Sequence, residues 1–316
     1  MILCLCLLIT TYLLFFPIPW FRGETGRKGD ALSAITEPVH SPAAVSKKLL
    51  IRGVQDLNLD PAHIENRFTL EKEGVPLIVE SSLDSDLQSF ILNLLEKSNT
   101  VKAAVVVMRP DDGRILAMVS YDSEKEGSSL CLKADYPAAS LFKIVSAAAA
   151  LESAGFSPEK QVSFVGRKHT LYKNQLKNRK SKYAATISFK KAFASSINPV
   201  FGKLGIYDLG RDVMTESAEK FFFNRSIPFD FPVGMSELFV PEDDFGVAEL
   251  ATGFNKGTTI SPLHAALLAS VVVNDGVMMK PWVVKRVTNE EGEILYENSE
   301  SRMGVSISPE TARDLR

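Results

Sequence analysis

The sequence has few of the residues that build metal sites and disulfide frameworks. It contains three cysteines and four histidines among 316 residues. Cys4 and Cys6 lie within one apolar run and Cys131 stands alone, so no disulfide framework is predicted. The histidines are scattered along the chain, whereas a metal site needs clustered ligands. We therefore expect neither a bound metal nor another cofactor.

The sequence also lacks an excess of charge of either sign. The formal net charge is −2, and 45% hydrophobic and 23% charged residues are typical of a globular protein. Residues 167–191 are the exception, with nine basic side chains and no acidic one. Such a stretch suits a negatively charged polymer or lipid headgroups. No nucleic-acid motif or aromatic interleaving accompanies it, so we expect no nucleic-acid partner, and a solvated surface is the simpler interpretation.

Residues 1–21 have no charged side chain. As a helix, this run would span about 30 Å, enough to cross a bilayer core. Pro17 and Pro19 would bend or end such a helix, and Trp20 suits a membrane interface. A cleaved signal peptide is the rival interpretation, but the basic n-region and the small-residue cleavage site are absent. We therefore predict an N-terminal membrane anchor.

Beyond this run, the chain divides into a linker and a folded domain. Residues 22–72 are predicted to be a juxtamembrane linker, because much of this part mixes Gly, Ser, Pro and charges without periodicity. The rest, residues 73–316, is predicted to be one domain. Its periodicity predicts an amphipathic helix at 83–97 and a buried helix at 261–273. Its turn residues and apolar runs predict a first hairpin at 102–121 and a second at 283–297.

Residues 136–151, YPAASLFKIVSAAAAL, form the stretch around which the domain is organised. The alanine-rich tail without a breaker predicts a buried helix, with Ser140 in its first turn. Ser140 and Lys143 are three residues apart and so share one helix face. A lysine acts as a base only where a dry environment holds it neutral, and the apolar tail can supply that environment. The pattern therefore predicts a Ser–Lys nucleophile.

The same spacing occurs at three other places, where the surroundings argue against a nucleophile. Ser157 precedes Pro158 in a turn-like segment, and the lysines of the other two pairs lie among charged residues where little desolvation is expected. These pairs are Ser157/Lys160, Ser188/Lys191 and Ser217/Lys220. For Ser140 itself, a serine that caps a core helix remains the alternative interpretation.

Ser196-Ile197-Asn198 is the only Ser-x-Asn sequence in the chain. It lies between a helix-like segment and Pro199, where a hydroxyl and an amide offer a donor and an acceptor at a helix end. An ordinary turn is the alternative, because Ser, Asn and Pro are all common in turns.

With Ser140-Leu-Phe-Lys143 followed by Ser196-Ile-Asn198, the chain resembles the transpeptidase domain of penicillin-binding proteins, the serine D,D-transpeptidases of bacterial cell-wall synthesis. The resemblance extends over roughly residues 75–316, through MRPDDGRILAMVS at 108–120 and ATGFNKGTTISPLHAALLASVVVNDGVMMKP at 251–281. It implies an α+β fold of the penicillin-binding-protein and β-lactamase type, with helices packed on an antiparallel sheet.

The resemblance also implies a role for each motif residue. Ser140 would be the acylated nucleophile, and Lys143 the base that takes its proton. Ser196 would relay a proton to the leaving amine, and Asn198 would hold the substrate amide or the lysine. The backbone amide of Ser140 would be one oxyanion donor.

The implied substrates are peptidoglycan stem peptides that end in D-Ala-D-Ala, and β-lactams would be inhibitors that acylate the same serine. The implied location is the bacterial cytoplasmic membrane, with a single N-terminal anchor and the catalytic domain on the extracytoplasmic side. Protein partners are not implied.

One departure from the family pattern matters, because no Lys-Thr-Gly or Lys-Ser-Gly occurs anywhere. In the family this motif follows the segment that Ser306–Arg316 matches, so we expect the C-terminal sheet strands to be missing from this chain. The departure keeps a non-catalytic, membrane-anchored cell-wall binding or scaffold protein open as an alternative. A serine β-lactamase is a third possibility, which the Ser-x-Asn form and the predicted anchor disfavour.

Overall fold

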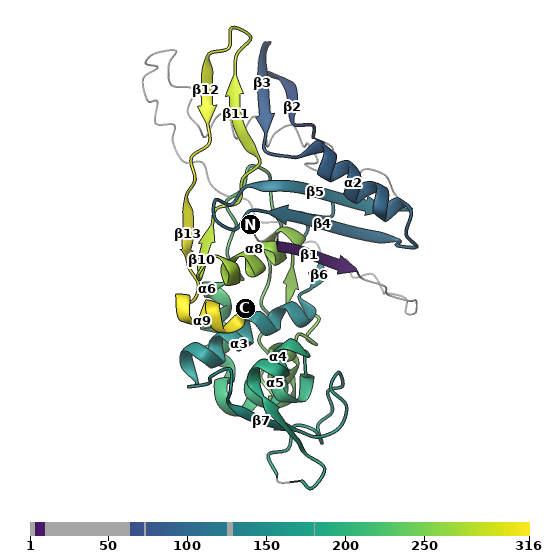
Figure 1. Ribbon diagram of the computed structural model, residues 1–316, viewed down its shortest axis with the longest axis vertical. Coiled ribbons are helices and arrows are strands. Elements are labelled where there is room, and N and C mark those ends of the chain that lie inside the picture. Colours follow the sequence, from purple (N-terminus) through teal and green to yellow (C-terminus); the bar gives the residue numbers. More distant parts are fainter. Residues whose placement is uncertain (1–3, 10–63, 73, 125–128, 180) are drawn as a thin grey trace, which may run out of the picture.

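The computed structural model describes residues 4–9, 64–72, 74–124, 129–179 and 181–316. Helices and antiparallel strands are mixed in an elongated body, with a strand-rich end and a helix-rich end (Figure 1). The predicted α+β class is confirmed.

A three-stranded antiparallel sheet forms the middle of the body, in the order β1-β4-β5. The predicted first hairpin is confirmed as β4 (Lys102–Met108) and β5 (Ile115–Asp122), in which Val105 lies opposite Val119. One face of this hairpin packs against α2 (Ser85–Glu96), through Ile91 and Leu95. Alternate residues of the same strands, such as Val106 and Met118, join the main core on the opposite face.

The strand β1 (Cys4–Ile9) pairs antiparallel with β4, so that Ile9 lies opposite Ala103. These six residues belong to the run predicted as a membrane-spanning helix, and in the structure they are a strand. Without β1, β4 would be an edge strand with unpaired backbone N–H and C=O groups. Pairing with these groups explains why residues 4–9 form a strand and not the predicted helix. The other residues of the predicted anchor, 1–3 and 10–21, lie outside the described residues. Among the described residues, no helix is both long and apolar enough to cross a bilayer.

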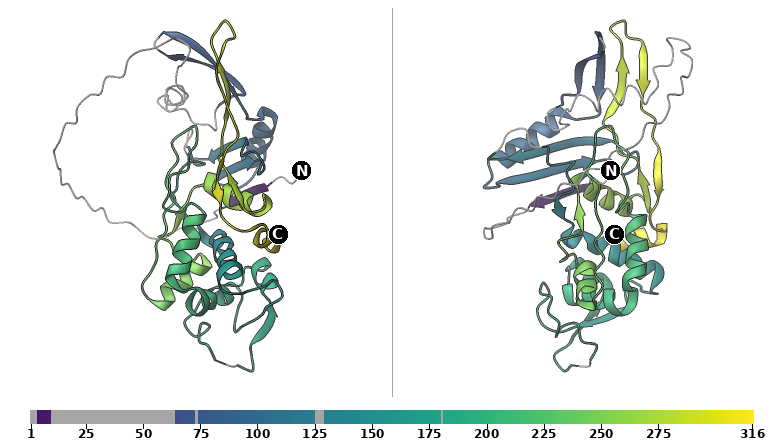
Figure 2. Two further views of the ribbon diagram at one scale, coloured as in Figure 1. Left: turned by 90° about the vertical axis from the view of Figure 1, so that its left-hand side faces the viewer. Right: turned by 180° about the vertical axis from the view of Figure 1, so that it is seen from behind.

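A second antiparallel sheet lies at the strand-rich end, in the order β12-β11-β3-β2 (Figures 1 and 2). The predicted second hairpin is confirmed as β11 (Val284–Thr288) and β12 (Ile294–Glu297). The strand β3 (Val75–Ser81) pairs with both β11 and β2 (Arg67–Lys72). The predicted domain boundary at residue 73 is therefore corrected, because Arg67–Lys72 is paired sheet rather than linker. Of the remaining linker residues, 22–63 lie outside the described residues, and 64–66 lead into β2.

The helix-rich end holds the candidate site. Its main core is lined by alanine and phenylalanine side chains from helices that pack around α3. The helices are α3 (Phe142–Ser153), α4 (Phe189–Ala194), α5 (Asn198–Leu204), α6 (Gly210–Lys220), α7 (Asp244–Thr252), α8 (Pro262–Val273) and α9 (Pro309–Leu315), with the π-helical turn η3 (Gly205–Leu209) after α5. Three short strand pairs complete it: β6 (Tyr136–Pro137) with β9 (Thr259–Ile260), β7 (Gln161–Phe164) with β8 (Ala185–Ser188), and β10 (Val277–Met279) with β13 (Arg302–Val305).

Candidate active site

Ser140 lies in a single 3-10 turn, Ala139–Leu141, that runs directly into α3. The prediction that it stands at the start of a buried helix is confirmed. Ala147 to Ala150 are all buried in the core, and these small side chains let α3 lie close to its neighbours. Ser140 is exposed, whereas the Lys143 side chain is only 1% exposed. The turn thus presents a hydroxyl to solvent above a buried amine.

The Lys143 amine lies 2.9 Å from the Ser140 hydroxyl oxygen. The same amine donates a hydrogen bond of 2.7 Å to the backbone carbonyl of Thr252. Burial disfavours the ammonium form and lowers the pKa of Lys143 to about 8. The predicted desolvated lysine is therefore present, and near neutral pH a useful fraction of it is the free base.

The last turn of α7 is the part of this site that sequence reasoning missed. The final carbonyls of a helix have no partner within the helix and need external donors. Lys143 donates to Thr252, and the buried Ser146 hydroxyl donates 2.9 Å to the carbonyl of Ala251. Residues 143 and 146 lie on one face of α3, so α3 is joined to the end of α7 at two points. The sequence did contain one signal for this helix end, Gly253, because glycine commonly follows the last residue of a helix.

Gly253 ends α7 in the left-handed region, at φ +76°. A Cβ at this position would lie 1.7 Å from the carbonyl oxygen of Ala139 and 3.0 Å from the backbone nitrogen of Ser140. The absence of a side chain thus allows the backbones of α7 and the Ser140 turn to meet.

Ser196 follows the C-terminal end of α4, and its side chain also contacts Ser140. Its hydroxyl lies 3.2 Å from the hydroxyl oxygen of Ser140. The backbone amides of Ser196 and Ile197 bond to the carbonyls of Phe193 and Ala192, which is the Schellman arrangement at a helix C-terminus. Ser196 occupies the left-handed position of this motif, at φ +48°, where glycine is usual.

Asn198 is the first residue of α5 and is buried, with its backbone amide bonded to the carbonyl of Lys168. Within the described residues, its side chain makes no hydrogen bond to Ser140 or Lys143. The structure therefore hydrogen-bonds Ser140 to both Lys143 and Ser196. Of the two roles expected for Asn198, the hydrogen bond to the lysine is not made in this structure, and the contact with a substrate amide stays a prediction.

The other three Ser-x-x-Lys pairs lack this geometry. Their lysines, Lys160, Lys191 and Lys220, are all exposed. Ser188 serves instead as the N-cap of α4, where its side chain accepts a bond from the backbone amide of Lys191. Burial of the amine is what separates Lys143 from these three.

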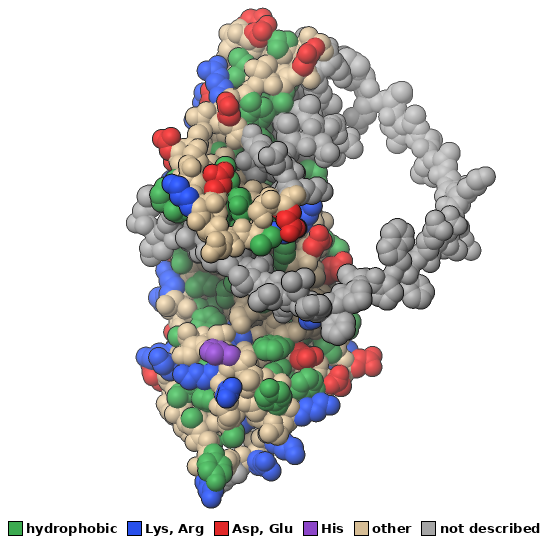
Figure 3. Space-filling model, turned by 90° about the vertical axis from the view of Figure 1, so that its right-hand side faces the viewer, with side chains coloured by type: hydrophobic (Ala, Val, Ile, Leu, Met, Phe, Trp, Pro, Cys, Tyr) green, Lys and Arg blue, Asp and Glu red, His purple; other side chains and the backbone are tan. Residues whose placement is uncertain are grey.

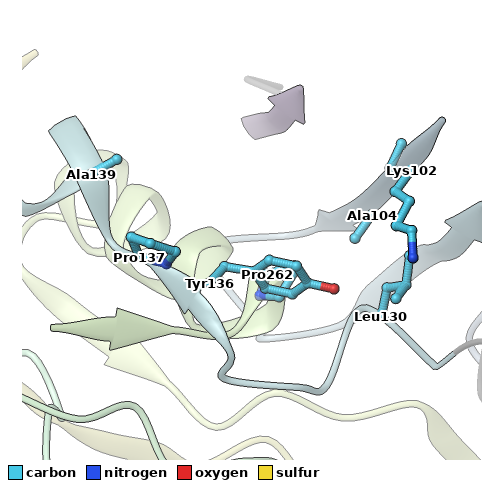
Figure 4. Close-up of a pocket in the computed structure, with 8 residues that line it drawn as sticks. Lys102, Ala104, Leu130, Tyr136, Pro137, Ala139 and Pro262 are labelled. Carbon is cyan, nitrogen blue, oxygen red and sulfur yellow. The ribbon is translucent and has the colours of Figure 1, made fainter. Parts of the chain in front are cut away.

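A hollow of about 60 Å³ lies beside the Ser140 turn. Figure 4 shows Ala139 at one end of it and Lys102 at the other, with the Tyr136 hydroxyl directed toward Leu130. Burial raises the pKa of Tyr136, so this phenol stays neutral. The lining is mostly apolar, and the Lys102 ammonium pairs with Asp122 at 3.0 Å.

The geometry agrees with comparisons to known proteins. The family model of the penicillin binding protein transpeptidase domain matches residues 103–316. The chain belongs to this family. Peptidoglycan D,D-transpeptidase PbpA of Mycolicibacterium smegmatis is 26% identical over 244 residues, which are 68% of this chain and 49% of that protein. Penicillin-binding protein 3 of Bacillus subtilis is 24% identical over 220 residues, 62% of this chain and 33% of that protein. The chain thus spans half or less of these relatives.

Solved structures show the same fold. The D,D-transpeptidase domain of a peptidoglycan glycosyltransferase from Eggerthella lenta has a TM-score of 0.64 at 25% identity, over 75% of this chain and 64% of that one. Penicillin-binding protein A from Mycobacterium tuberculosis, in a ceftriaxone acyl-enzyme complex, has a TM-score of 0.63 at 23% identity, over 75% of this chain and 60% of that one.

Gly253→Ala is expected to destabilise the protein strongly, because its Cβ would collide with the backbone of Ala139. Gly292→Ala is the matched control: Gly292 has a similar φ of +83°, but nothing lies within 4 Å of its added Cβ. We expect the free energy of unfolding to fall by about 3 kcal/mol more for Gly253→Ala than for the control. Urea denaturation of the two variants measures this difference, and equal losses would mean that only backbone strain matters.

Ser196→Gly is expected to stabilise the protein by about 1 kcal/mol, since glycine relieves the left-handed strain at this position. Ser195→Gly is the control, because Ser195 has an ordinary φ of −99° and glycine there adds only chain entropy to the unfolded state. The two variants should therefore shift the urea midpoint in opposite directions. A loss of stability in both would show that Ser196 is unstrained.

Proposed function

We propose that this chain is a serine D,D-transpeptidase that cross-links peptidoglycan stem peptides through an acyl-enzyme on Ser140. The observation that carries the proposal is the buried Lys143 amine, 2.9 Å from the Ser140 hydroxyl oxygen and anchored on the Thr252 carbonyl. A serine becomes a nucleophile beside a base, and burial makes this lysine a base.

In acylation, the neutral Lys143 amine directs one hydrogen to Thr252 and its lone pair to Ser140. The hydroxyl proton moves to the amine as the serine oxygen bonds to the carbonyl carbon of the penultimate D-Ala. The negative charge that develops on the substrate oxygen is stabilised by the backbone amide of Ser140.

Breakdown of the tetrahedral adduct requires a proton on the leaving amine. The ammonium of Lys143 supplies it through the Ser196 hydroxyl, which lies 3.2 Å from the serine oxygen. The carbon–nitrogen bond breaks, terminal D-Ala leaves, and an ester to Ser140 remains. An amine of a neighbouring strand, or water, attacks this ester in the reverse sequence of proton transfers. Asn198, at the start of α5, is proposed to hold the amide of the bound peptide.

The partners proposed with this activity are stem peptides ending in D-Ala-D-Ala, and β-lactams as inhibitors that acylate Ser140. Relatives and solved structures named as D,D-transpeptidases and as acyl-enzyme complexes support this assignment. The proposed location is the extracytoplasmic side of the bacterial cytoplasmic membrane, and membership of the transpeptidase family supports it.

Labelling with a fluorescent penicillin tests the proposal. We expect covalent labelling of the full chain, its complete loss in Ser140→Ala, and unchanged labelling in Ser157→Ala, the serine of another Ser-x-x-Lys pair. Absence of labelling in the folded chain would favour the non-catalytic binding protein instead. Rapid turnover of a chromogenic cephalosporin would favour the serine β-lactamase.

The rate of acylation is expected to rise with pH through about 8, since only the neutral form of Lys143 accepts the serine proton. Below that pKa the neutral fraction falls about tenfold per pH unit, and the rate should fall with it. Single-turnover labelling between pH 5.5 and 9 measures the profile. A rate that is flat across this range would show that Lys143 is not the base.

A further inference from the structure

A second cavity, remote from Ser140, lies at the far end of α5. It has a volume of about 240 Å³ and is bounded by the segment after α3, by β7, by Asn178 and by α5 with η3. Its floor is apolar, with Val162, Val200 and Leu204 among the lining residues, and its rim is polar. This volume is below the range of about 300–1,000 Å³ for pockets that hold drug-sized ligands, so a smaller molecule fits it.

Two lysines stand at the rim of this cavity without an acidic partner. Within the described residues, neither the Lys160 nor the Lys203 ammonium forms a salt bridge. The Lys160 ammonium lies 3.5 Å from the centre of the Phe156 ring, and the Lys203 ammonium is 3.5 Å from the carbonyl of Ser163. Partial burial lowers the pKa of Lys203, because desolvation disfavours its charge. An anion at the rim would offset that desolvation.

Among the described residues that line the cavity, Asp208 has the single carboxyl group. It forms no salt bridge with either lysine. Burial raises the pKa of Asp208, because desolvation disfavours its charge, and the nearby Lys160 opposes that rise. The Asp208 carboxyl and the Lys160 ammonium attract each other but are too far apart to form a salt bridge. The cavity therefore keeps a net excess of positive charge.

The surrounding surface increases this excess. Asn178 of the rim stands between Lys177 and Arg179 in the basic stretch 167–191, and both neighbours are exposed. Figure 3 shows Lys and Arg side chains gathered around the lower end of the molecule. Within the described residues, Lys190 is the one cation of this stretch in a salt bridge, with Glu159. Unpaired surface cations steer anions toward a cleft.

We propose that this cavity binds the carboxylate end of a short peptide, with the carboxylate between Lys160 and Lys203 and a small apolar side chain on the Val162–Val200–Leu204 floor. A carboxylate fits better than a free phosphate because half of the lining is apolar. The site is separate from the chemistry at Ser140, and its occupancy does not require that chemistry.

Occupancy of the cavity is connected to the candidate active site by short rigid segments. The helix α5 carries Lys203 near its end and Asn198 at its start. The strand β7 pairs with β8, which leads directly into α4 and the turn that holds Ser196. A peptide in the cavity would thus contact the elements that place Ser196 and Asn198.

The test uses the full chain with its lysines labelled by reductive ¹³C-methylation, which keeps their charge. The probes are N-acetyl-L-Ala-L-Ala and its C-terminal amide, with N-acetyl-D-Ala-D-Ala to compare wall-type with ordinary peptides. The Lys160 and Lys203 resonances, assigned from Lys160→Met and Lys203→Met, should shift saturably with either acid. The amide should bind at least tenfold more weakly.

Lys220→Met is the matched control, because Lys220 is an exposed lysine on α6 that pairs with Glu216. Binding should be unchanged in this variant and weakened at least fivefold in Lys160→Met, which replaces an exposed side chain. Equal binding of acid and amide, or a uniform shift of all surface lysines, would overturn the proposal. Penicillin labelling of the unmethylated chain reports separately on Ser140.

Discussion

The site depends on keeping one amine out of water. Lys143 is almost fully buried, and its amine has the Ser140 hydroxyl and the Thr252 carbonyl as hydrogen-bonding partners. A fully charged ammonium in such a place is costly, so desolvation shifts the amine toward the neutral form. The result is a pKa of about 8. A catalytic base is most effective when its pKa lies near the pH at which the enzyme works.

The backbone around this amine is strained at the points where functional groups are presented. Ala139 and Ser196 both have φ of +48°, a conformation that costs residues with a side chain about 1–2 kcal/mol. At Ser196 the reason is visible, because glycine would relieve the strain but carry no hydroxyl toward Ser140. Strain of this kind persists only where the surrounding structure determines it. Here the Schellman bonds of α4 and the contact of Gly253 with Ala139 do so.

Local signals in the sequence predicted the elements that depend on neighbouring residues. The spacing of Ser140 and Lys143 placed both on one helix face, and the Pro-Asp-Asp-Gly turn located the β4–β5 hairpin. Contacts between distant residues could not be predicted in this way. Thr252 is 109 residues from Lys143, and nothing in the alanine-rich stretch indicates which carbonyl will accept from the amine. Likewise, the pairing of β3 with β11 joins segments about 200 residues apart, and nothing in either segment indicates its partner.

The same long-range packing explains why the site can respond to events elsewhere. Ser196 and Asn198 are separated by one residue, yet each ends or begins a different helix, so their relative position depends on how α4 and α5 pack. That packing is fixed on one side by α7, where the Ala251 side chain lies against Gly205, and on the other by β7 and the cavity. A cavity is the less constrained of the two sides, because its lining lacks contacts on one face. Filling it would therefore add contacts to β7 and α5, the elements that lead to the Ser196 turn and carry Asn198.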